Sequence, residues 1–232
     1  TFVGGAEIPL CHQLTIGEIA QYIQCHYCKK VQLEVVWMSG WHRNSLWYEF
    51  DCPWVLPSPN MPTVETAIVY PGMVLLEATN VSEGRGTTRP FELFGAPWIE
   101  KEKFFRELFN CCLPGCTFRQ HDFIPTFQKH KAEVCFGVQI HVTNPRGYKP
   151  VQTAIAILNA VKQSSSSKFE FTSPPYEYEY HEMPFDILVG NKIVRNAIEK
   201  NTSFDDIFNQ WEDIGKNWMK SQKEILHYLW ER

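Results

Sequence analysis

Apolar residues at helical spacing predict four helical regions. Thr15 to Glu18 form a capping box, in which the Thr15 hydroxyl caps the helix and Glu18 reaches back to the chain before it. The apolar residues that follow recur at helical spacing, so a helix begins here. The same spacing predicts an amphipathic helix over residues 100–110, a helix over 151–161 and one or two C-terminal helices over 204–230.

Short apolar runs between these regions predict strands. Residues 31–38 are rich in Val and Leu and indicate a buried strand, and residues 73–78 indicate a short strand that carries Glu77 near its end. Two further strands are expected over 116–124 and 134–142. Residues 176–180 alternate Tyr and Glu, but two prolines precede them, so we expect an irregular or edge segment. Strands that alternate with helices are typical of an α/β protein.

Two segments read as loops, and one as a boundary. Residues 39–63 hold three tryptophans and four prolines, which indicates a long ordered loop rather than a linker. Within it, Trp54 and the prolines offer flat faces for sugar rings, and Asn60 offers hydrogen bonds to hydroxyls. The alternative, a rigid loop that covers the sheet, is favoured by chemistry alone. Residues 163–168 contain four consecutive serines and predict a mobile loop, and Pro97-Trp98 marks a boundary.

A glycine-rich segment, residues 80–92, follows the strand expected to end near Glu77. Gly84 and Gly86 flank Arg85 and allow a sharp turn close to a ligand. Arg85 and Arg89 carry planar guanidinium groups that match a carboxylate. The other polar side chains in and beside the segment are Glu77, Asn80, Ser82, Glu83, Thr87 and Thr88. This set suits a polar, carboxylated ligand, and it is equally typical of an Arg–Glu network that locks a surface loop.

Histidines and cysteines give weaker signals. His12 precedes the capped helix and can face a ligand at that helix N-terminus, and His141 takes one face of the strand over 134–142. A lone histidine is more often structural than catalytic. Cys25 and Cys28 form a single C-x-x-C with no second half, so we expect no zinc site, and no metal or other cofactor is indicated. The absence of a Gly-x-Ser-x-Gly motif argues against Ser-His-Asp chemistry.

Composition narrows the function classes. The 232 residues are 44% hydrophobic and 21% charged, as in a globular protein, with a net charge of −4 and no basic stripe. Nucleic acid is therefore an unexpected partner. No apolar run is long enough for a membrane span, and the first residues lack the pattern of a secretory signal. The eight cysteines fit either disulfides or buried thiols, so they do not fix the compartment.

Many motifs, in order along the chain, together resemble the NamZ family of exo-β-N-acetylmuramidases. They are Phe2-Val3-Gly4, Ile8-Pro9, His12, residues 15–18, Gly40-Trp41, Arg43, residues 53–55, 57–62 and 70–72, Glu77, Thr79-Asn80, residues 82–92 and 95–98, Lys129-His130, Cys135, residues 137–139 and 141–143, and Phe185-Asp186. One such motif is a weak signal, whereas this many in sequence is specific.

The resemblance implies a fold, a reaction and a site. It implies that residues 1–97 complete a Rossmann-like catalytic domain, that residues 98–232 form a smaller α/β domain, and that the site lies between them. Such enzymes release terminal N-acetylmuramic acid from peptidoglycan fragments, so the implied partners are muropeptides and muramyl-glucosamine saccharides. This substrate favours a periplasmic or secreted location. Arg85 or Arg89 would clamp the lactyl carboxylate of muramic acid.

Site residues follow from the same resemblance. Glycoside hydrolysis needs an acid and a base or nucleophile, and Glu77 and Glu83 are the candidate catalytic residues. The expected substrate-binding residues are His12, Asn60, Tyr70, Asn80, Ser82, Arg85, Thr87, Thr88, Arg89 and His141.

The sequence also departs from the family. Members begin upstream of Phe2 with a Pro-Glu-His-Gly motif that is expected to hold an essential acid, so this chain is expected to be an incomplete part of the enzyme. Gln13 and Leu14 stand where His-Gly-Met is usual, Ala78 replaces a usual glycine, residues 50–52 replace Thr-Gly-Leu, and Asn144 replaces an aspartate. These changes predict relaxed or altered specificity. The alternative function is a muropeptide-binding or carbohydrate-binding homologue without turnover.

Overall fold

The structure, a computed structural model, describes residues 5–228, and the chain divides into two compact units. The central unit is Trp54–Phe204. The terminal unit joins residues 5–53 to the described residues that follow Phe204. The Phe2-Val3-Gly4 motif lies outside the described residues, as do the last two residues of the C-terminal helices expected over 204–230.

A three-stranded antiparallel sheet forms part of the central unit. Its order is β1 (Leu93–Ala96), β3 (Phe136–Val142), β2 (Cys116–Gln120). Gly95 in β1 lies opposite Gly137 in β3. The strand expected over 116–124 is shorter than predicted, and only an isolated bridge continues the pairing beyond it.

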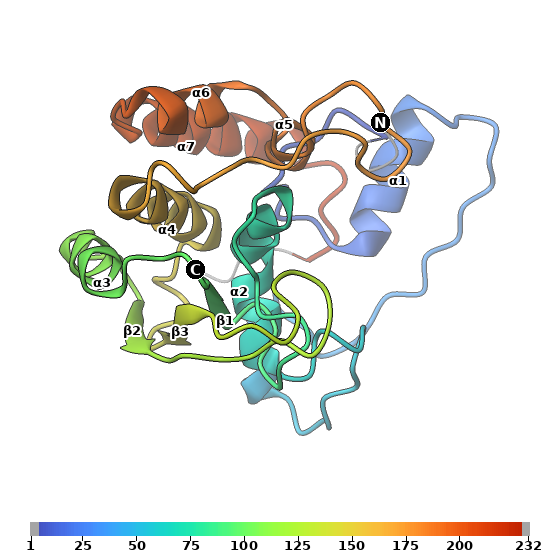
Figure 1. Ribbon diagram of the computed structural model, residues 1–232. Coiled ribbons are helices and arrows are strands. Elements are labelled where there is room, and N and C mark those ends of the chain that lie inside the picture. The colour runs from blue at the N-terminus through green and yellow to red at the C-terminus, as the bar shows by residue number, and fades with distance from the viewer. Residues whose placement is uncertain (1–4, 229–232) are drawn as a thin grey trace. The chain divides into compact units, whose positions relative to one another are not determined.

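Helices make up most of the rest of the central unit (Figure 1). They are α2 (Val64–Met73), the 3-10 helix η2 (Val74–Ala78), α3 (Lys101–Asn110), α4 (Pro150–Ser164), α5 (Pro184–Val189) and α6 (Ile193–Lys200). Helix α4 contacts α2, α3 and α6, and its Ile155, Ile157 and Leu158 are fully buried. The two helices predicted over 100–110 and 151–161 are therefore confirmed as α3 and α4.

Residues 73–78 are helical, so the strand predicted there is wrong. The Thr63 side chain caps α2, and the chain passes from α2 directly into η2. Leu75 and Leu76 are fully buried, which explains the apolar run. A short run of this kind is equally compatible with a buried helix, because its spacing alone does not separate the two. Glu77 therefore sits in a helical turn immediately before residues 80–92.

The terminal unit contains α1 (Ile16–His26), the 3-10 helix η1 (Trp47–Glu49) and α7 (Asp205–Ser221). Both hydrogen bonds of the predicted capping box are present at the start of α1. Glu18 of this box is fully buried and forms an ion pair with Arg43. The C-terminal helix prediction is confirmed by α7.

Residues 31–38 do not form the predicted buried strand. The segment has no strand partner among the described residues, and Val36 is 91% exposed. Val35 and Trp37 instead approach Gly17 of α1, and the Trp37 ring stacks on His227 with centroids 4.0 Å apart. The Val-rich run is therefore only partly explained by packing within the unit.

Part of the loop predicted over residues 163–168 is helical or buried. Helix α4 continues to Ser164, and both Ser164 and Ser165 are buried. The Ser165 hydroxyl accepts a hydrogen bond from the Glu100 backbone N–H at the start of α3. The prediction of a mobile loop over residues 163–168 is therefore wrong for Ser164 and Ser165.

Seven α-helices and one small sheet among the described residues confirm the mixed α/β class. The assignment of residues 1–97 to a Rossmann-like domain, with its boundary at residue 97, stays a prediction. None of the helices in residues 5–228 combines the length and the apolar character that crossing a membrane requires.

Gln13 occupies backbone that favours glycine. Its φ is +56°. Because a side chain in left-handed backbone is strained, Gln13→Gly is expected to raise the free energy of unfolding by about 0.5–1 kcal/mol. Urea denaturation measures this change. If Gln13→Gly instead lowered the free energy of unfolding by the same amount, the Gln13 side chain would stabilise the fold by more than the strained backbone destabilises it.

Candidate functional site

Residues 80–92, which we call the signature loop, are held in a fixed turn beside the sheet. The backbones of Ser82 and Gly95 in β1 exchange two hydrogen bonds. Gly84 and Gly86 have φ of +77° and +82°, as the sequence predicted for a sharp turn. A Cβ atom on Gly84 would lie 2.4 Å from the Leu93 carbonyl oxygen, and one on Gly86 would lie 2.7 Å from the Phe127 nitrogen. Only glycine fits both positions, which places Arg85 between two rigid turns.

Four charged side chains meet at this turn, and we call them the ion-pair cluster: Glu77, Glu83, Arg85 and Lys129. Glu83 is 2% exposed, and its two oxygens lie 3.2 Å from Arg85 Nε and 2.9 Å from Lys129 Nζ. The Arg85 guanidinium also pairs with Glu77 through Nη2. Two carboxylates and two cations balance, so the cluster is neutral as a whole. Glu77, Arg85 and Lys129 are partly exposed, at 19%, 22% and 24%, whereas Glu83 is buried.

Aromatic side chains surround the exposed part of the cluster. The Phe91 ring lies 5.0 Å from the Arg85 guanidinium carbon, and Tyr70 meets Phe91 edge to face. The Tyr176 hydroxyl lies 3.5 Å from Glu77 Oε2 and donates toward it. Burial, followed by the Glu77 charge, raises the pKa of Tyr70 and raises that of Tyr176 to about 12. Both phenols are therefore neutral donors at physiological pH.

The charge state of Arg85 is set by its two carboxylate partners. Burial pulls its pKa down, but the hydrogen bond and charge of Glu77 and the charge of Glu83 outweigh burial, so the pKa is raised. The guanidinium therefore stays charged and donates a hydrogen bond to Glu77. Glu77 accepts this hydrogen bond, and its second oxygen faces the Tyr176 hydroxyl.

Arg89 belongs to a second, more open network at the end of the signature loop. Its Nη1 atom lies 3.6 Å from Glu92 Oε1, and the same oxygen accepts hydrogen bonds from the hydroxyls of Thr66 at 2.7 Å and Thr63 at 3.1 Å. The Arg89 side chain is 44% exposed. Glu92 is thus stabilised by two hydroxyls, and Arg89 keeps guanidinium surface in solvent that an anionic ligand can reach.

The small polar side chains predicted to bind substrate mostly build the loop instead. Both ends of the Asn80 amide are used, with Nδ2 donating to the Lys168 carbonyl and Oδ1 accepting from the Glu170 N–H. Ser82 is buried, and its hydroxyl accepts from the Gly84 N–H. Thr87 donates to the Gly84 carbonyl at 2.6 Å. Thr88 is exposed.

Three other predicted residues are not members of the ion-pair cluster. His12 belongs to the terminal unit, where its Nδ1 accepts from the Leu14 N–H, and burial lowers its pKa. His141 is exposed on β3 opposite Thr117. Asn60 is half-buried in a loop that the bond from Trp54 Nε1 to the Met61 carbonyl holds, as expected of a rigid loop.

Sequence reasoning missed Lys129 and Tyr176 as members of the site. Lys129 lies 46 residues after Glu83, and Tyr176 lies 99 residues after Glu77. Neither spacing carries a periodic signal, so the fold alone reveals these contacts. Lys129-His130 stood out only as a family motif, and the Tyr/Glu alternation over 176–180 resembled an edge segment.

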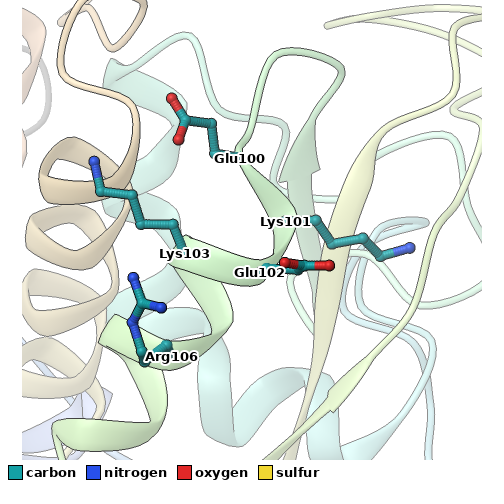
Figure 2. A pocket seen from close by; sticks show the side chains of 5 residues that line it. All are labelled: Glu100, Lys101, Glu102, Lys103 and Arg106. Carbon is teal, nitrogen blue, oxygen red and sulfur yellow. The ribbon is translucent and has the colours of Figure 1, made fainter.

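A separate hollow lies along α3, and only charged side chains line it (Figure 2). They are Glu100, Lys101, Glu102, Lys103 and Arg106. None of them is a predicted site residue, and Lys101 already pairs with Asp122. Ligand pockets are usually walled by apolar groups with a few placed polar ones. We therefore place the candidate site at the ion-pair cluster rather than here.

Thiols and metal ligands add no further chemistry within the described residues. All eight cysteines are free thiols in the structure, but only Cys135 is buried, so the expectation of buried thiols holds for that residue alone. No group of three or more His, Cys, Asp or Glu side chains within residues 5–228 is placed to hold a metal ion.

Comparison with solved structures first defines the class of fold. A DUF1343 family protein from Bacteroides fragilis superposes with a TM-score of 0.84 at 25% identity, over 99% of this chain and 60% of that chain. A second DUF1343 family protein from the same organism gives a TM-score of 0.71 at 23% identity, over 100% and 60%. The chain therefore has the DUF1343 fold over nearly its whole length.

The sequence comparisons then identify the family. The profile described as "Exo-beta-N-acetylmuramidase NamZ, C-terminal" matches residues 68–228, and its N-terminal counterpart matches residues 1–65. The chain belongs to the NamZ family, as its motifs predicted. It is 41% identical over 228 residues to the peptidoglycan beta-N-acetylmuramidase NamZ of Bacillus subtilis, which covers 98% of this chain. The chain spans about half the length of that curated relative, 53%.

Proposed function

We propose that this chain is the substrate-recognising part of an exo-β-N-acetylmuramidase that releases terminal N-acetylmuramic acid from peptidoglycan fragments. The observation that carries the proposal is the 41% identity to a peptidoglycan β-N-acetylmuramidase over 98% of the chain. The ion-pair cluster also supports the proposal. It lies at a turn whose positions 84 and 86 fit only glycine, and enzyme sites place charged groups on rigid backbone.

Glu77 is the carboxylate of the cluster that a sugar can reach. Arg85 forms an ion pair with it, and one of its oxygens faces Tyr176. An ionised carboxylate acts as a base, a nucleophile or an acceptor for ring hydroxyls. Glu83 is buried with a cation on each oxygen, so we assign it to holding Arg85 rather than to reacting. This narrows the two candidate catalytic residues to Glu77.

Arg89 is the better placed of the two arginines for the lactyl carboxylate. The Arg85 guanidinium already bridges two carboxylates, whereas Arg89 is 44% exposed and has one long ion pair at 3.6 Å. A guanidinium matches a carboxylate with two parallel hydrogen bonds. We include Tyr70 and Thr88 in the proposal as further substrate contacts.

The test of the function is release of N-acetylmuramic acid by the full-length protein from a muramyl-glucosamine disaccharide or a chromogenic muramide. The proposal expects the free sugar to accumulate. Binding of the disaccharide in calorimetry with no product would instead favour a carbohydrate-binding homologue without turnover.

The lactyl contact is tested by Arg89→Ala in the same protein. Because charged hydrogen bonds contribute about 1.5–3 kcal/mol, affinity for N-acetylmuramic acid is expected to fall by about tenfold to a hundredfold. Affinity for N-acetylglucosamine, which lacks the carboxylate, should change little. Calorimetry with both sugars measures the difference. Arg119→Ala is the matched control, because Arg119 is also exposed and bonds Gln139 on the neighbouring strand. An equal loss for both sugars would remove Arg89 from this role.

A further inference from the structure

Lys129 is a half-buried residue, with a side chain 24% exposed, and its amine has all of its donors in use. Its Nζ lies 2.8 Å from the Leu76 carbonyl oxygen, 3.1 Å from that of Val81 and 2.9 Å from Glu83 Oε2. An ammonium has three N–H donors, so this geometry satisfies every one of them. The three acceptors come from η2, from the signature loop backbone and from the ion-pair cluster. One side chain thereby ties together the elements that carry Glu77 and Glu83.

The loop that carries Lys129 has left-handed backbone conformations on both sides of this residue. Gln128, His130 and Ala132 have φ of +63°, +55° and +63°, and none of them is glycine. Such conformations cost energy and persist only where the surroundings impose them. The surroundings do so here, because Thr126 donates two hydrogen bonds to the Gly86 carbonyl and His130 Nε2 lies 2.8 Å from the Asn80 carbonyl oxygen. The fold therefore holds Lys129 against the signature loop from both flanks.

Glu83 needs Lys129 if Arg85 is to serve Glu77. Glu83 is 2% exposed, and a buried carboxylate is costly unless it is paired. Arg85 is shared between the two carboxylates. Because Lys129 compensates the charge of Glu83, the four charges of the cluster sum to zero. The Arg85 charge can then act on Glu77. Burial lowers the pKa of Lys129, and the Glu83 charge opposes this, which fits mutual dependence of the pair.

We propose that Lys129 is a positioning residue, which neutralises the buried Glu83 and so leaves Arg85 to hold the ionised Glu77 carboxylate at the ligand-facing side. The effect of this Lys129 role on turnover rests on the proposed function. The charged and titratable groups that act on Glu77 are Arg85 from the signature loop, Lys129 from the loop before β3, Tyr176 from the loop before α5 and Tyr70 from α2. Tyr70 and Tyr176 stay neutral, so the charged groups near Glu77 are those of the cluster.

Three variants of the full-length protein separate this role from simple support of the fold. Lys129→Met leaves Glu83 unbalanced, so the pKa of Glu77 should rise by about one pH unit. The double variant Lys129→Met with Glu83→Gln removes both charges and should return the Glu77 pKa to the wild-type value or below. Lys129→Arg keeps the charge and should keep the pKa close to the wild-type value.

Two readouts follow each variant. Carbon-13 NMR titration of the Glu77 side-chain carboxyl, assigned with Glu77→Gln, reports the pKa without any substrate. The pH dependence of kcat/KM for muramide hydrolysis reports the same group in action. Since Glu77 acts ionised, a raised pKa moves the acid limb of the profile to higher pH. On that acid limb, Lys129→Met should therefore be about tenfold less active than wild type if the Glu77 pKa rises by about one pH unit.

Arg195→Met is the matched control, because Arg195 forms a buried pair with Asp186 elsewhere in the central unit, at 2.9 and 2.8 Å. It should lower stability and leave both readouts unchanged. The proposal is overturned if Lys129→Met shifts neither readout, or if the double variant fails to reverse the shift. If Lys129→Met does not fold, the double variant decides, because a Glu77 pKa above the wild-type value would contradict the proposal. A wild-type protein that releases no product would sink the proposed function, and the NMR titration would still decide the role of Lys129.

Discussion

Glu77→Gln is expected to reduce release of N-acetylmuramic acid by the full-length protein by about 10²–10⁴-fold, the usual contribution of a positioned acid or base. Glutamine keeps the size of the side chain and an oxygen toward Arg85 but loses the charge. Glu77 is the reachable carboxylate of the cluster, at 19% exposure. Product release over time, at saturating muramyl-glucosamine disaccharide, measures the effect. The loss should fall on kcat more than on KM.

Two further variants are compared with Glu77→Gln. Glu102→Gln changes an exposed glutamate of α3 and should leave turnover unchanged. Glu83→Gln should lower stability, because it leaves Lys129 facing an amide, and should reduce turnover less than Glu77→Gln does. If the two glutamate variants of the cluster lost turnover in the opposite order, Glu83 would be the reacting carboxylate.

Glu18→Ala is expected to lower the free energy of unfolding by about 3–5 kcal/mol, the usual cost of breaking a buried ion pair. Glu18 is fully buried and pairs with Arg43, which is 3% exposed. Glu18 also accepts from the backbone of Thr15 at 2.7 Å and of His227 at 2.9 Å. Removing it leaves the Arg43 charge and two part-buried N–H groups without this partner. Urea denaturation of the full-length protein measures the change.

The control for this change is Glu199→Ala, which removes a 44% exposed partner of Arg195. An exposed pair contributes less than about 1 kcal/mol, so the control should change stability little. A similar small effect of Glu18→Ala would show that the terminal unit does not depend on this pair.

Glu18 also makes stability depend on pH. Burial would raise its pKa, but hydrogen bonds from Thr15, Arg43 and His227 outweigh burial and lower it. A lowered folded-state pKa means that the contribution is fully present above the unfolded value of about 4.3 and is lost as pH falls through the folded value. The wild-type protein should therefore lose stability in this acid range more steeply than Glu18→Gln.

Local signals in the sequence predicted the helices well. Thr15 and Glu18 supply both bonds of a capping box within four residues, and α3 and α4 show clear helical spacing. The turn at Gly84 and Gly86 was also predictable, because closely spaced glycines in a polar segment favour left-handed backbone. These features depend on neighbours in the chain, which is why spacing reveals them.

Features that depend on distant partners were not predictable. Residues 73–78 and 31–38 both read as strands, yet one run is buried as a 3-10 helix and the other is extended without a strand partner among the described residues. The roles within the signature loop were equally hidden. The sequence offered Arg85 and Arg89 as equivalent clamps, and only the placement of Lys129 and Glu83 shows that Arg85 is already committed.

The most direct test of the account is a crystal structure of the full-length Glu77→Gln protein with a muramyl-glucosamine disaccharide. The account predicts the muramic acid ring within hydrogen-bonding distance of residue 77, with its lactyl carboxylate on Arg89. A disaccharide bound elsewhere, such as at the charged hollow on α3, with no contact to the signature loop, would contradict it.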